Sequence, residues 1–449
     1  MCLKVRSIAK EEALTGKKAR SESLGEIFTR EFLLLSTINL AMFFGFQMLN
    51  IGLPMYMDQL GATGQIVGLA TTLMTVMATI MRVFAGAMLD RFGRMGMLIG
   101  GTIVMACSIV AFAIFPIVGV ILGLRLLHGV GWGLGSTACA TVAADIIPKK
   151  RFAEGMGYFA MTNAISSALA PAVALELVQG VGSVYMILVS AAITVLALIL
   201  SFIEIRFSRR RNAQEKAVLE SESPAGSTTA PSEGQPQADE VSPAGAPPKG
   251  AALAQPQKEY SKFDTLFERR AILPGILMML ANVGFGTIAT FIALHADAQG
   301  VEGVSIYFVV YAVITLASRP FIGRLIDRHG YRIPAILSTI CTAATLVIIG
   351  VSDNLLMFSI AGALGGLGIG TAMGTFQAMA VASVEPWRRG VATSTFMTLF
   401  DLGIAIGATF GGVIVDIAGY AIMYFVVALF PIIASIISAV AIKKTARNQ

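Results

Sequence analysis

Long apolar runs constrain the fold of this chain more than any other feature of its sequence. A largely apolar run of about 18 or more residues is long enough to cross a bilayer as a helix. Twelve such runs occur, near residues 32–57, 65–89, 95–115, 117–145, 154–178, 184–206, 271–295, 303–325, 332–351, 354–383, 391–417 and 420–442. We therefore predict an all-α integral membrane protein with twelve transmembrane helices.

The composition excludes the main soluble classes of protein. Hydrophobic residues make up 55% of the 449 residues and charged residues only 13%, whereas soluble domains carry about 25% charged residues. A water-soluble enzyme and a nucleic-acid-binding domain are therefore excluded. The four cysteines show no disulfide or metal-binding spacing, and no zinc-protease, serine-hydrolase or phosphate-loop motif occurs. We expect no metal, no cofactor and no enzymatic activity.

One long segment differs from the rest of the chain. Residues 207–270 hold seven of the 16 prolines, together with many Ser, Gly, Glu and Gln residues. Such a segment cannot bury enough apolar surface to offset its ordering entropy. We expect a disordered linker here, between six-helix bundles at residues 31–206 and 271–442. Residues 1–30 form an N-terminal arm without the apolar core of a signal peptide, and residues 443–449 form a short tail.

The basic residues predict the orientation in the membrane. Of the 33 Lys and Arg residues, all but Arg125 lie in the N-terminal arm, the linker, the tail or the loops after even-numbered spans, if helix-end residues such as Arg82 and Arg319 are counted with the loops. Basic loops remain on the cytoplasmic side. Both termini and the linker are therefore predicted to be cytoplasmic, in a multi-pass protein of the cell membrane.

The two halves of the chain repeat each other at a shift of 237 residues. The motif formed by Arg82, Gly86, Asp90, Arg91 and Gly93 recurs as Arg319, Gly323, Asp327, Arg328 and Gly330. After one inserted residue, Asn163 aligns with Asp401. A duplicated six-helix unit is typical of secondary transporters, which bind substrate between the halves near the middle of the membrane.

Several of these motifs resemble those of one transporter family. The stretch GAMLDRFGR, from Gly86 to Arg94, resembles the loop 2–3 signature of the major facilitator superfamily, and residues 323–332 resemble its second copy. The motif Arg125-x3-Gly129-x-Gly131 resembles the span 4 signature of the proton-coupled members. The resemblance implies two pseudo-symmetric six-helix bundles that carry a small-molecule substrate, and we expect a monomer.

Two further stretches bear on the branch of this family. Leu53-Pro54 and the sequence LGAT at 60–63 resemble the drug/proton antiporter branch. In the fifth span, Pro171 is present as in the antiporter signature, but alanines replace the expected glycines on both sides of it. That departure weakens the argument for export over import.

The repeated loop motif suggests a gate. The resemblance places the Asp90 carboxylate against the start of span 11, near Val391 to Thr395, and the repeat places Asp327 against the start of span 5, near Phe152 to Gly155. A carboxylate at the positive end of a helix is stabilising. The predicted gating residues are Gly86, Asp90, Arg91, Gly93, Arg94, Gly323, Asp327, Arg328 and Gly330. The alternative is a charged loop that is simply solvated.

Asp401 is the acidic residue predicted to lie deepest in the membrane. It stands about ten residues, or roughly 15 Å, into span 11, which is half of a ~30 Å hydrocarbon core. It points away from a stripe formed by Gly403, Gly407 and Gly411, which allows another helix to pack closely. We expect its carboxylate to line a central cavity with Arg125 and Asn163 and to carry a proton. A structural carboxylate paired within the bundle is the alternative.

Three other polar residues are candidates for proton coupling or substrate binding. Arg125 is permanently charged, so it can attract an anion or tune a neighbouring group but cannot carry a proton. His128 lies one turn further on the same helix face and titrates near neutral pH in water; the alternative is a packed histidine. Asn163 is expected either to bind substrate or to make a contact between helices.

These features predict a secondary transporter. Our first interpretation is proton-coupled efflux of a small molecule, by alternating access of the two bundles. A second is a proton symporter that imports an anionic metabolite and anchors it on Arg125. A third, of a different class, is a transporter-like sensor or a lipid scramblase. The expected partners are therefore the substrate, protons and the lipid bilayer.

Overall fold

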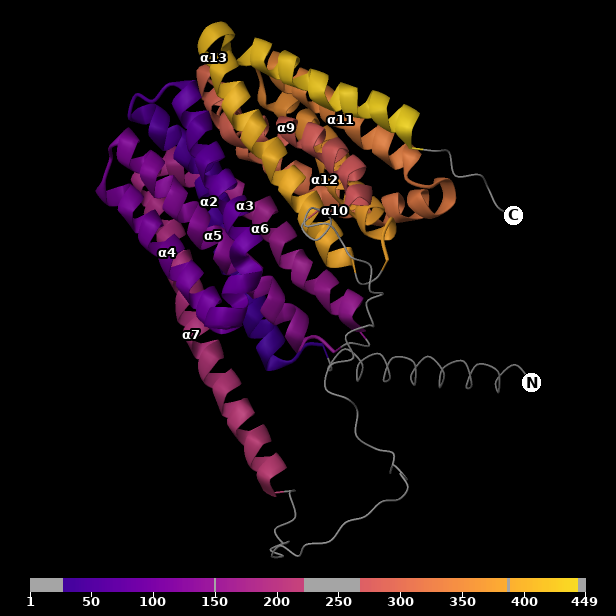
Figure 1. The fold of residues 1–449 in the computed structure, drawn as a ribbon. Coiled ribbons are helices and arrows are strands. Elements are labelled where there is room, and N and C mark those ends of the chain that lie inside the picture. The colour runs from indigo at the N-terminus through magenta and orange to yellow at the C-terminus, as the bar shows by residue number, and fades with distance from the viewer. Residues whose placement is uncertain (1–26, 149–150, 222–266, 386–387, 443–449) are drawn as a thin grey trace, which may run out of the picture.

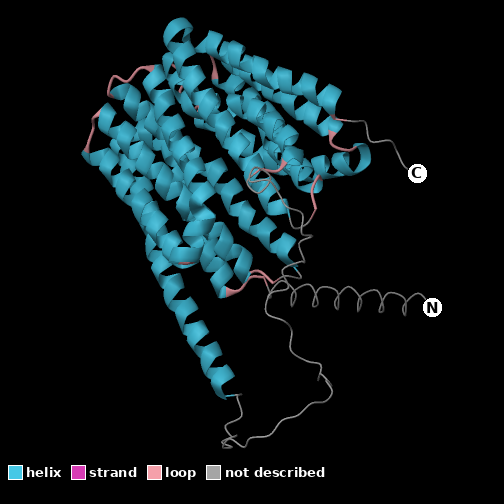
Figure 2. Ribbon diagram, in the orientation of Figure 1, coloured by secondary structure: helices cyan, strands magenta, loops and turns pink. Residues whose placement is uncertain are grey.

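The computed structural model describes residues 27–148, 151–221, 267–385 and 388–442. Within these ranges every regular element is a helix, as Figure 2 shows. The helices are α2 (Arg30–Gln59), α3 (Gly64–Phe92), α4 (Arg94–Ile114), α5 (Val118–Ile146), α6 (Phe152–Gly180), α7 (Ser183–Ser221), α9 (Arg269–Ala298), α10 (Ser305–His329), α11 (Arg332–Val351), α12 (Leu355–Ala382) and α13 (Arg389–Ala441). The all-α prediction is confirmed.

The longest element, α13, consists of two helices. Gly419 interrupts it with φ 82° and ψ 172°, a conformation that favours glycine, and the chain turns back there (Figure 1). Counting its two parts separately, the described residues form twelve helical segments, which correspond to the twelve predicted spans. Ten helices are long and apolar enough to cross a membrane when α13 is counted once, and α10 has a shorter apolar stretch, Ser305–Arg319.

The helices form two bundles that lie side by side, α2–α7 and α9–α13 (Figure 1). Helices α2 and α9 begin, and α7 and α13 end, at one face of the molecule, which we call the terminal face. The loops after α2, α6 and α9 and the turn in α13 lie at the opposite face.

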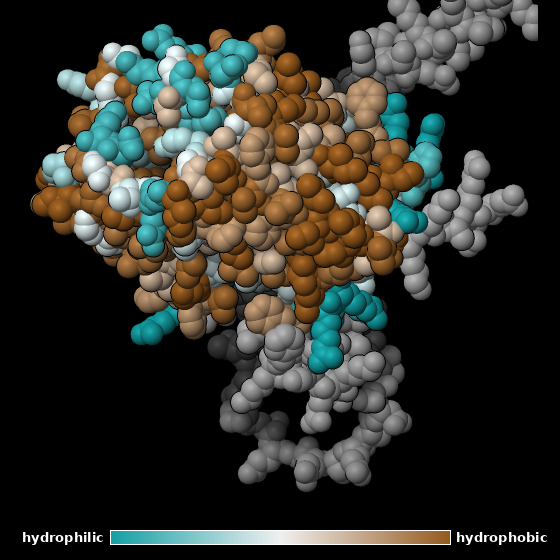
Figure 3. Space-filling model, turned by 90° about the horizontal axis from the view of Figure 1, so that it is seen from above, coloured by the Kyte–Doolittle hydropathy of each residue, from teal (hydrophilic) through white to brown (hydrophobic). Residues whose placement is uncertain are grey.

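Large apolar side chains are exposed along the helices. Val440, Ile417 and Leu356 have exposed fractions of 82%, 81% and 69%, and Figure 3 shows apolar side chains over much of the surface seen from above. A soluble monomer rarely exposes so much contiguous apolar surface. This apolar surface is suited to contact with the acyl chains of a lipid bilayer.

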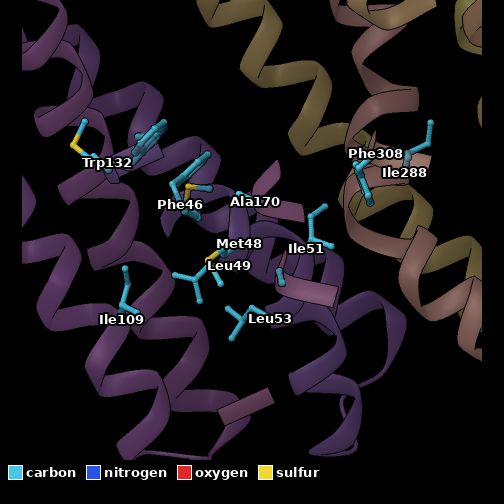
Figure 4. Close-up of a cluster of buried hydrophobic side chains, with 14 of the residues drawn as sticks. Phe46, Met48, Leu49, Ile51, Leu53, Ile109, Trp132, Ala170, Ile288 and Phe308 are labelled. Atoms are coloured by element: carbon cyan, nitrogen blue, oxygen red, sulfur yellow. The ribbon is translucent and has the colours of Figure 1, made fainter. Parts of the chain in front are cut away.

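Glycines allow the helices of the N-terminal bundle to pack closely. A Cβ atom on Gly131 would lie 2.7 Å from the carbonyl oxygen of Gly101, so α4 and α5 touch through their backbones. Above this contact the rings of Phe46 and Trp132 stack with centroids 3.7 Å apart (Figure 4). Because lipid offers no hydrophobic advantage to helix association, such close packing is what holds a membrane bundle together.

The structure corrects one predicted boundary. Helix α7 continues to Ser221, so residues 207–221 of the predicted disordered linker are helical. This stretch contains no Pro or Gly and is rich in Arg, Ala, Glu and Lys, which are good helix formers. Most of the predicted linker, 222–266, lies outside the described residues, as do 1–26 of the predicted arm and the tail 443–449.

Candidate functional site

The most extensive contacts between the two halves are made by two helix pairs that the sequence repeat relates to each other. Helix α3 packs on the first part of α13, and its repeat counterpart α10 packs on α6. We call the α3–α13 pair the first seam and the α6–α10 pair the second seam.

The first seam is a backbone-to-backbone contact in its outer part, near the opposite face. A Cβ atom added to Gly68 would overlap with the carbonyl group of Ala408, and one added to Gly412 would overlap with the carbonyl group of Gly64. Glycine is therefore required on both helices. The Thr72 hydroxyl donates to the carbonyl oxygen of Ala405, at 2.8 Å, and fixes the register of the two helices.

At the opposite face, Asp416 closes the first seam. Its two carboxylate oxygens accept hydrogen bonds from the backbone N–H groups of Gly64, at 2.7 Å, and Gln65, at 2.8 Å. These groups belong to the first turn of α3, where N–H groups have no partner within the helix and the helix dipole is positive. The carboxylate therefore joins the C-terminal half to the N-terminal half.

Further toward the terminal face, the same seam contains an ion pair. The Asp401 carboxylate accepts hydrogen bonds from the Arg82 guanidinium and from the Thr79 hydroxyl, the latter at 3.1 Å. The side chain of Asp401 is 11% exposed and that of Arg82 is 29% exposed. Two largely buried opposite charges thus bridge the halves, ten residues before α3 ends at Phe92.

The partners of Asp401 differ from those that were expected. Asp401 was expected to share a site with Arg125 and Asn163, but its counter-ion is Arg82. Arg82 had been grouped with the basic residues at helix ends. The Asn163 carboxamide instead accepts a hydrogen bond from Asn39 of α2, at 2.6 Å. The structure thus gives Asp401 and Asn163 separate partners. One feature of the sequence could have identified Arg82 as a site residue. It is the first residue of the repeated motif, and it lies within the apolar part of its span.

The second seam is built differently. Near the opposite face, the Ser305 hydroxyl donates to the Glu176 carboxylate at 2.9 Å, and this contact is exposed. The repeat puts Arg319 in the place of Arg82 and Asn163 in the place of Asp401, so the second seam has no carboxylate at the position where the first has one.

Loop residues of the repeated motif divide into those that make turns and those that carry charge. Gly93 and Gly330 follow α3 and α10 with φ of 74° and 69°, so each makes the sharp turn into the next helix. Arg94 forms an ion pair with Asp145 of α5. The Arg91 guanidinium lies 5.4 Å from the ring centroid of its neighbour Phe92.

The predicted gating contacts of Asp90 and Asp327 stay predictions. Their side chains, and the surroundings of Gly86, lie outside the described part of the structure. Gly323 was expected to allow close helix contact, but within the described part of the chain no atom of another helix lies within 4 Å of a Cβ built on it. Arg328 is exposed. In the helix start that Asp90 was expected to contact, the Thr395 hydroxyl accepts a hydrogen bond from the backbone N–H of Glu268, at 2.9 Å.

Arg125 and His128 lie inside the N-terminal bundle. Both side chains are fully buried. Among the described residues, neither ring nitrogen of His128 and neither Nε nor Nη1 of Arg125 has a hydrogen-bond partner. The imidazole lies between the rings of Phe46 and Phe112, with centroids 6.0 Å away in both cases. A buried polar group without a partner requires an explanation.

Comparison with known proteins agrees with this architecture. The chain matches the sequence profile of the Major Facilitator Superfamily over residues 35–310 and 275–449. It is 22% identical over 421 residues to the "Staphylopine export protein" of Staphylococcus aureus, covering 91% of this chain and 95% of that protein. It is also 28% identical over 159 residues to the "Uncharacterized MFS-type transporter YhhS" of Escherichia coli, covering 35% of this chain and 39% of that protein.

Solved structures share the fold at low sequence identity. A mutant of the nucleoside transporter NupG superposes with a TM-score of 0.70 at 11% identity, covering 92% of this chain and 100% of that chain. A POT family transporter in complex with a thioalcohol-conjugated peptide gives 0.68 at 12% identity, covering 91% and 95%. With twelve helical segments in two repeated bundles and a profile match over nearly its whole length, the chain belongs to the major facilitator superfamily of membrane transporters.

Proposed function

We propose that this protein is a proton-coupled efflux transporter that works by alternating access of its two bundles, with the terminal face in the cytoplasm. The observation that carries the proposal is the ion pair between Arg82 and Asp401, which joins the halves. Asp401 can bind and release a proton, and Arg82 cannot. Protonation at this site therefore changes the contact on which alternation depends.

The charges of the pair suggest how a proton acts. When Asp401 is ionised, the pair is neutral and holds α3 against α13 together with the Thr79 hydroxyl. Protonation neutralises the carboxylate and leaves the guanidinium without its counter-ion. Loss of one charge of a buried ion pair destabilises a protein by about 3–5 kcal/mol. The cost is smaller here because the Arg82 side chain is 29% exposed. An effect of this size is enough to shift an equilibrium between two conformations.

The contacts formed at the two seams are those expected in one step of an alternating-access cycle. Contacts of Asp416 and Glu176 close the halves together at the opposite face, while the ionised pair occupies the first seam. In an antiport cycle this corresponds to the carrier after it has released its proton to the cytoplasm and before it takes up substrate. Proton entry from outside would then follow the opening of the opposite face.

The direction of transport is supported by the similarity to the staphylopine export protein over 91% of the chain. The orientation is supported by the basic residues near the terminal face, among them Arg94, Arg328 and Arg332. We further propose that the protein acts as a monomer in the cell membrane, because each chain has both halves of the pathway.

A flux assay tests the proposal. Purified protein is reconstituted into vesicles, and a thermal-stabilisation screen of small amphipathic molecules supplies substrates for it. Flux of each hit is then measured with and without an imposed pH gradient. We expect hits to move against their own gradient only when protons move the other way. Flux that the pH gradient leaves unchanged would overturn proton coupling, and accumulation in the same direction as the protons would show symport instead.

A further inference from the structure

We propose that Arg125 and His128 form a subsite within the N-terminal bundle that binds an anionic group, such as a carboxylate, of the transported molecule. The inference rests on the proposed function only in taking the bound molecule to be the substrate. It assigns a role to two buried polar residues that the Arg82–Asp401 pair leaves unexplained.

The first observation is a buried positive charge without a partner. Arg125 is fully buried, and its Nε and Nη1 atoms have no hydrogen-bond partner among the described residues. A guanidinium keeps its charge even when it is buried. Removing such a charge from water is very costly unless an opposite charge or several hydrogen bonds compensate for it.

The surrounding helices cannot supply the compensating charge from their membrane interior. In α2 to α5 the acidic residues are Glu31, Asp58, Asp90 and Asp145, which all lie at or near helix ends. Asp145 is already paired with Arg94. The one acidic residue deep in the membrane, Asp401, is paired with Arg82 in the first seam. In the same bundle Glu204 is also buried, but it lies two residues before the apolar span of α7 ends at the terminal face, whereas Arg125 lies seven residues from the start of α5 at the opposite face. We therefore expect the anion that neutralises Arg125 to come from a ligand.

Further unpartnered polar atoms lie around Arg125. Gly129, one turn away on α5, packs on the backbone of Met74 in α3, and these helices run parallel, so Arg125 is nearly level with Thr71. The Thr71 hydroxyl and both nitrogens of His128 are buried without partners. A neutral imidazole has one N–H donor and one acceptor. Together with the guanidinium, these groups can donate to the oxygens of a carboxylate.

Aromatic rings lie next to His128 in the proposed subsite. His128 lies between Phe46 and Phe112, and Trp132, one turn further along α5, stacks on Phe46 at 3.7 Å. An arginine one helical turn from a histidine that contacts aromatic rings suits a ligand with an anionic head and an apolar body. Since Arg125 is covered in this structure, binding must shift the covering side chains, and the stacked pair of Trp132 and Phe46 will respond.

The chain offers a built-in reporter for this event. It has two tryptophans, so the substitution Trp387→Phe leaves Trp132 as the sole tryptophan. Fluorescence of this variant, purified in detergent, is titrated with phenylacetate and with its neutral amide, phenylacetamide, at concentrations up to about 10 mM. Phosphate is titrated separately to show whether a free inorganic anion suffices. We expect saturable binding of phenylacetate, and binding of the amide at least tenfold weaker.

Substitutions then assign the binding to the subsite. Arg125→Gln should abolish the phenylacetate response, and His128→Gln should weaken it by several-fold. Arg206→Gln, which removes an exposed charge at the end of the apolar span of α7, is the matched control and should bind like its parent. Each variant is first checked for a single folded peak and a cooperative thermal transition. If Arg125→Gln does not fold, Arg125→Lys takes its place and should bind phenylacetate more weakly.

Three results would overturn the inference: equal affinity for acid and amide, unchanged binding in the folded Arg125 variant, or no saturable response to any anion tested. Because the titration uses no gradient, its outcome is separate from that of the flux assay. Proton-independent flux with intact phenylacetate binding would refute the coupling mechanism and leave the subsite in place.

Discussion

The two seams between the halves occupy equivalent places in the repeat but are built from different chemistry. In the first, glycines bring α3 and α13 into backbone contact, Asp416 joins the start of α3, and Arg82 is paired with Asp401. In the second, a hydroxyl–carboxylate hydrogen bond between Ser305 and Glu176 joins the halves at the opposite face. Duplication thus supplied two similar helix pairs, and among the described residues only the first has a buried carboxylate paired with an arginine of the other half.

A bulky residue in the first seam should have the largest effect. Gly68→Leu places a side chain where the backbone of Ala408 lies, so the outer parts of α3 and α13 cannot close. We expect transport to fall at least tenfold in vesicles while the protein remains folded. Gly180→Ala in α6 of the second seam is the control, because no atom lies within 4 Å of the added Cβ. Normal transport by Gly68→Leu would show that close contact is dispensable.

Removing one partner of the ion pair should come next. Arg82→Gln leaves the Asp401 carboxylate buried without its counter-ion, which costs up to about 3 kcal/mol if Asp401 stays ionised. We expect a lower thermal midpoint of the purified protein at pH 8, with part of the loss recovered at pH 5, where the carboxylate can take up a proton. Adding Asp401→Asn to Arg82→Gln should restore stability. If the double variant is no more stable than Arg82→Gln, the pair contributes little.

A variant in which the second seam also has a carboxylate at the repeat position tests whether the two seams are equivalent. Asn163→Asp introduces a carboxylate at the repeat position of Asp401, where Arg319 corresponds to Arg82. We expect turnover to fall several-fold and to depend on pH over a wider range, because two titratable contacts would then join the halves. A pH profile identical to that of the wild type would mean that the seams do not act equivalently.

The contacts at the opposite face should have the smallest effects. Asp416→Asn keeps the shape but removes the charge that accepts two N–H groups of α3, and charge-assisted hydrogen bonds contribute about 1.5–3 kcal/mol. Disulfide cross-linking between cysteines placed at the exposed positions 65 and 417, on either side of this contact, should become at least fivefold slower. Glu176→Gln, which alters one exposed hydrogen bond, should change that rate less than twofold. Equal effects of the two substitutions would argue against a special role for Asp416.

Much of the fold could be predicted because the apolar runs and their polar breaks are local features of the sequence. The burial of Asp401 could be anticipated in the same way, by counting residues from the helix start. Its partner could not, because Arg82 is 319 positions away and the pairing depends on how α3 crosses α13. The contact of Asp416 with α3 depends on the same packing, since the N–H groups of a first turn can donate to any nearby carboxylate.

The boundary of the linker was missed for a different reason. Proline content averaged over residues 207–270 hid a proline-free stretch that continues α7 to Ser221. A search for the first helix breaker after span 6 would have ended the helix near Pro224. For Arg82, the cost of placing any charge within a span was the signal that could have been used.

Uphill transport by Asp401→Asn is the measurement that decides whether protons act on transport through the Arg82–Asp401 pair. The substitution preserves the shape of the side chain and removes the site at which the first seam can bind a proton. With a substrate from the stabilisation screen and an imposed pH gradient, wild-type vesicles should accumulate it against its gradient. The variant should still exchange substrate downhill but should show no accumulation. If Asp401→Asn accumulates substrate at the wild-type rate, the pair of Arg82 and Asp401 is structural and protons act elsewhere.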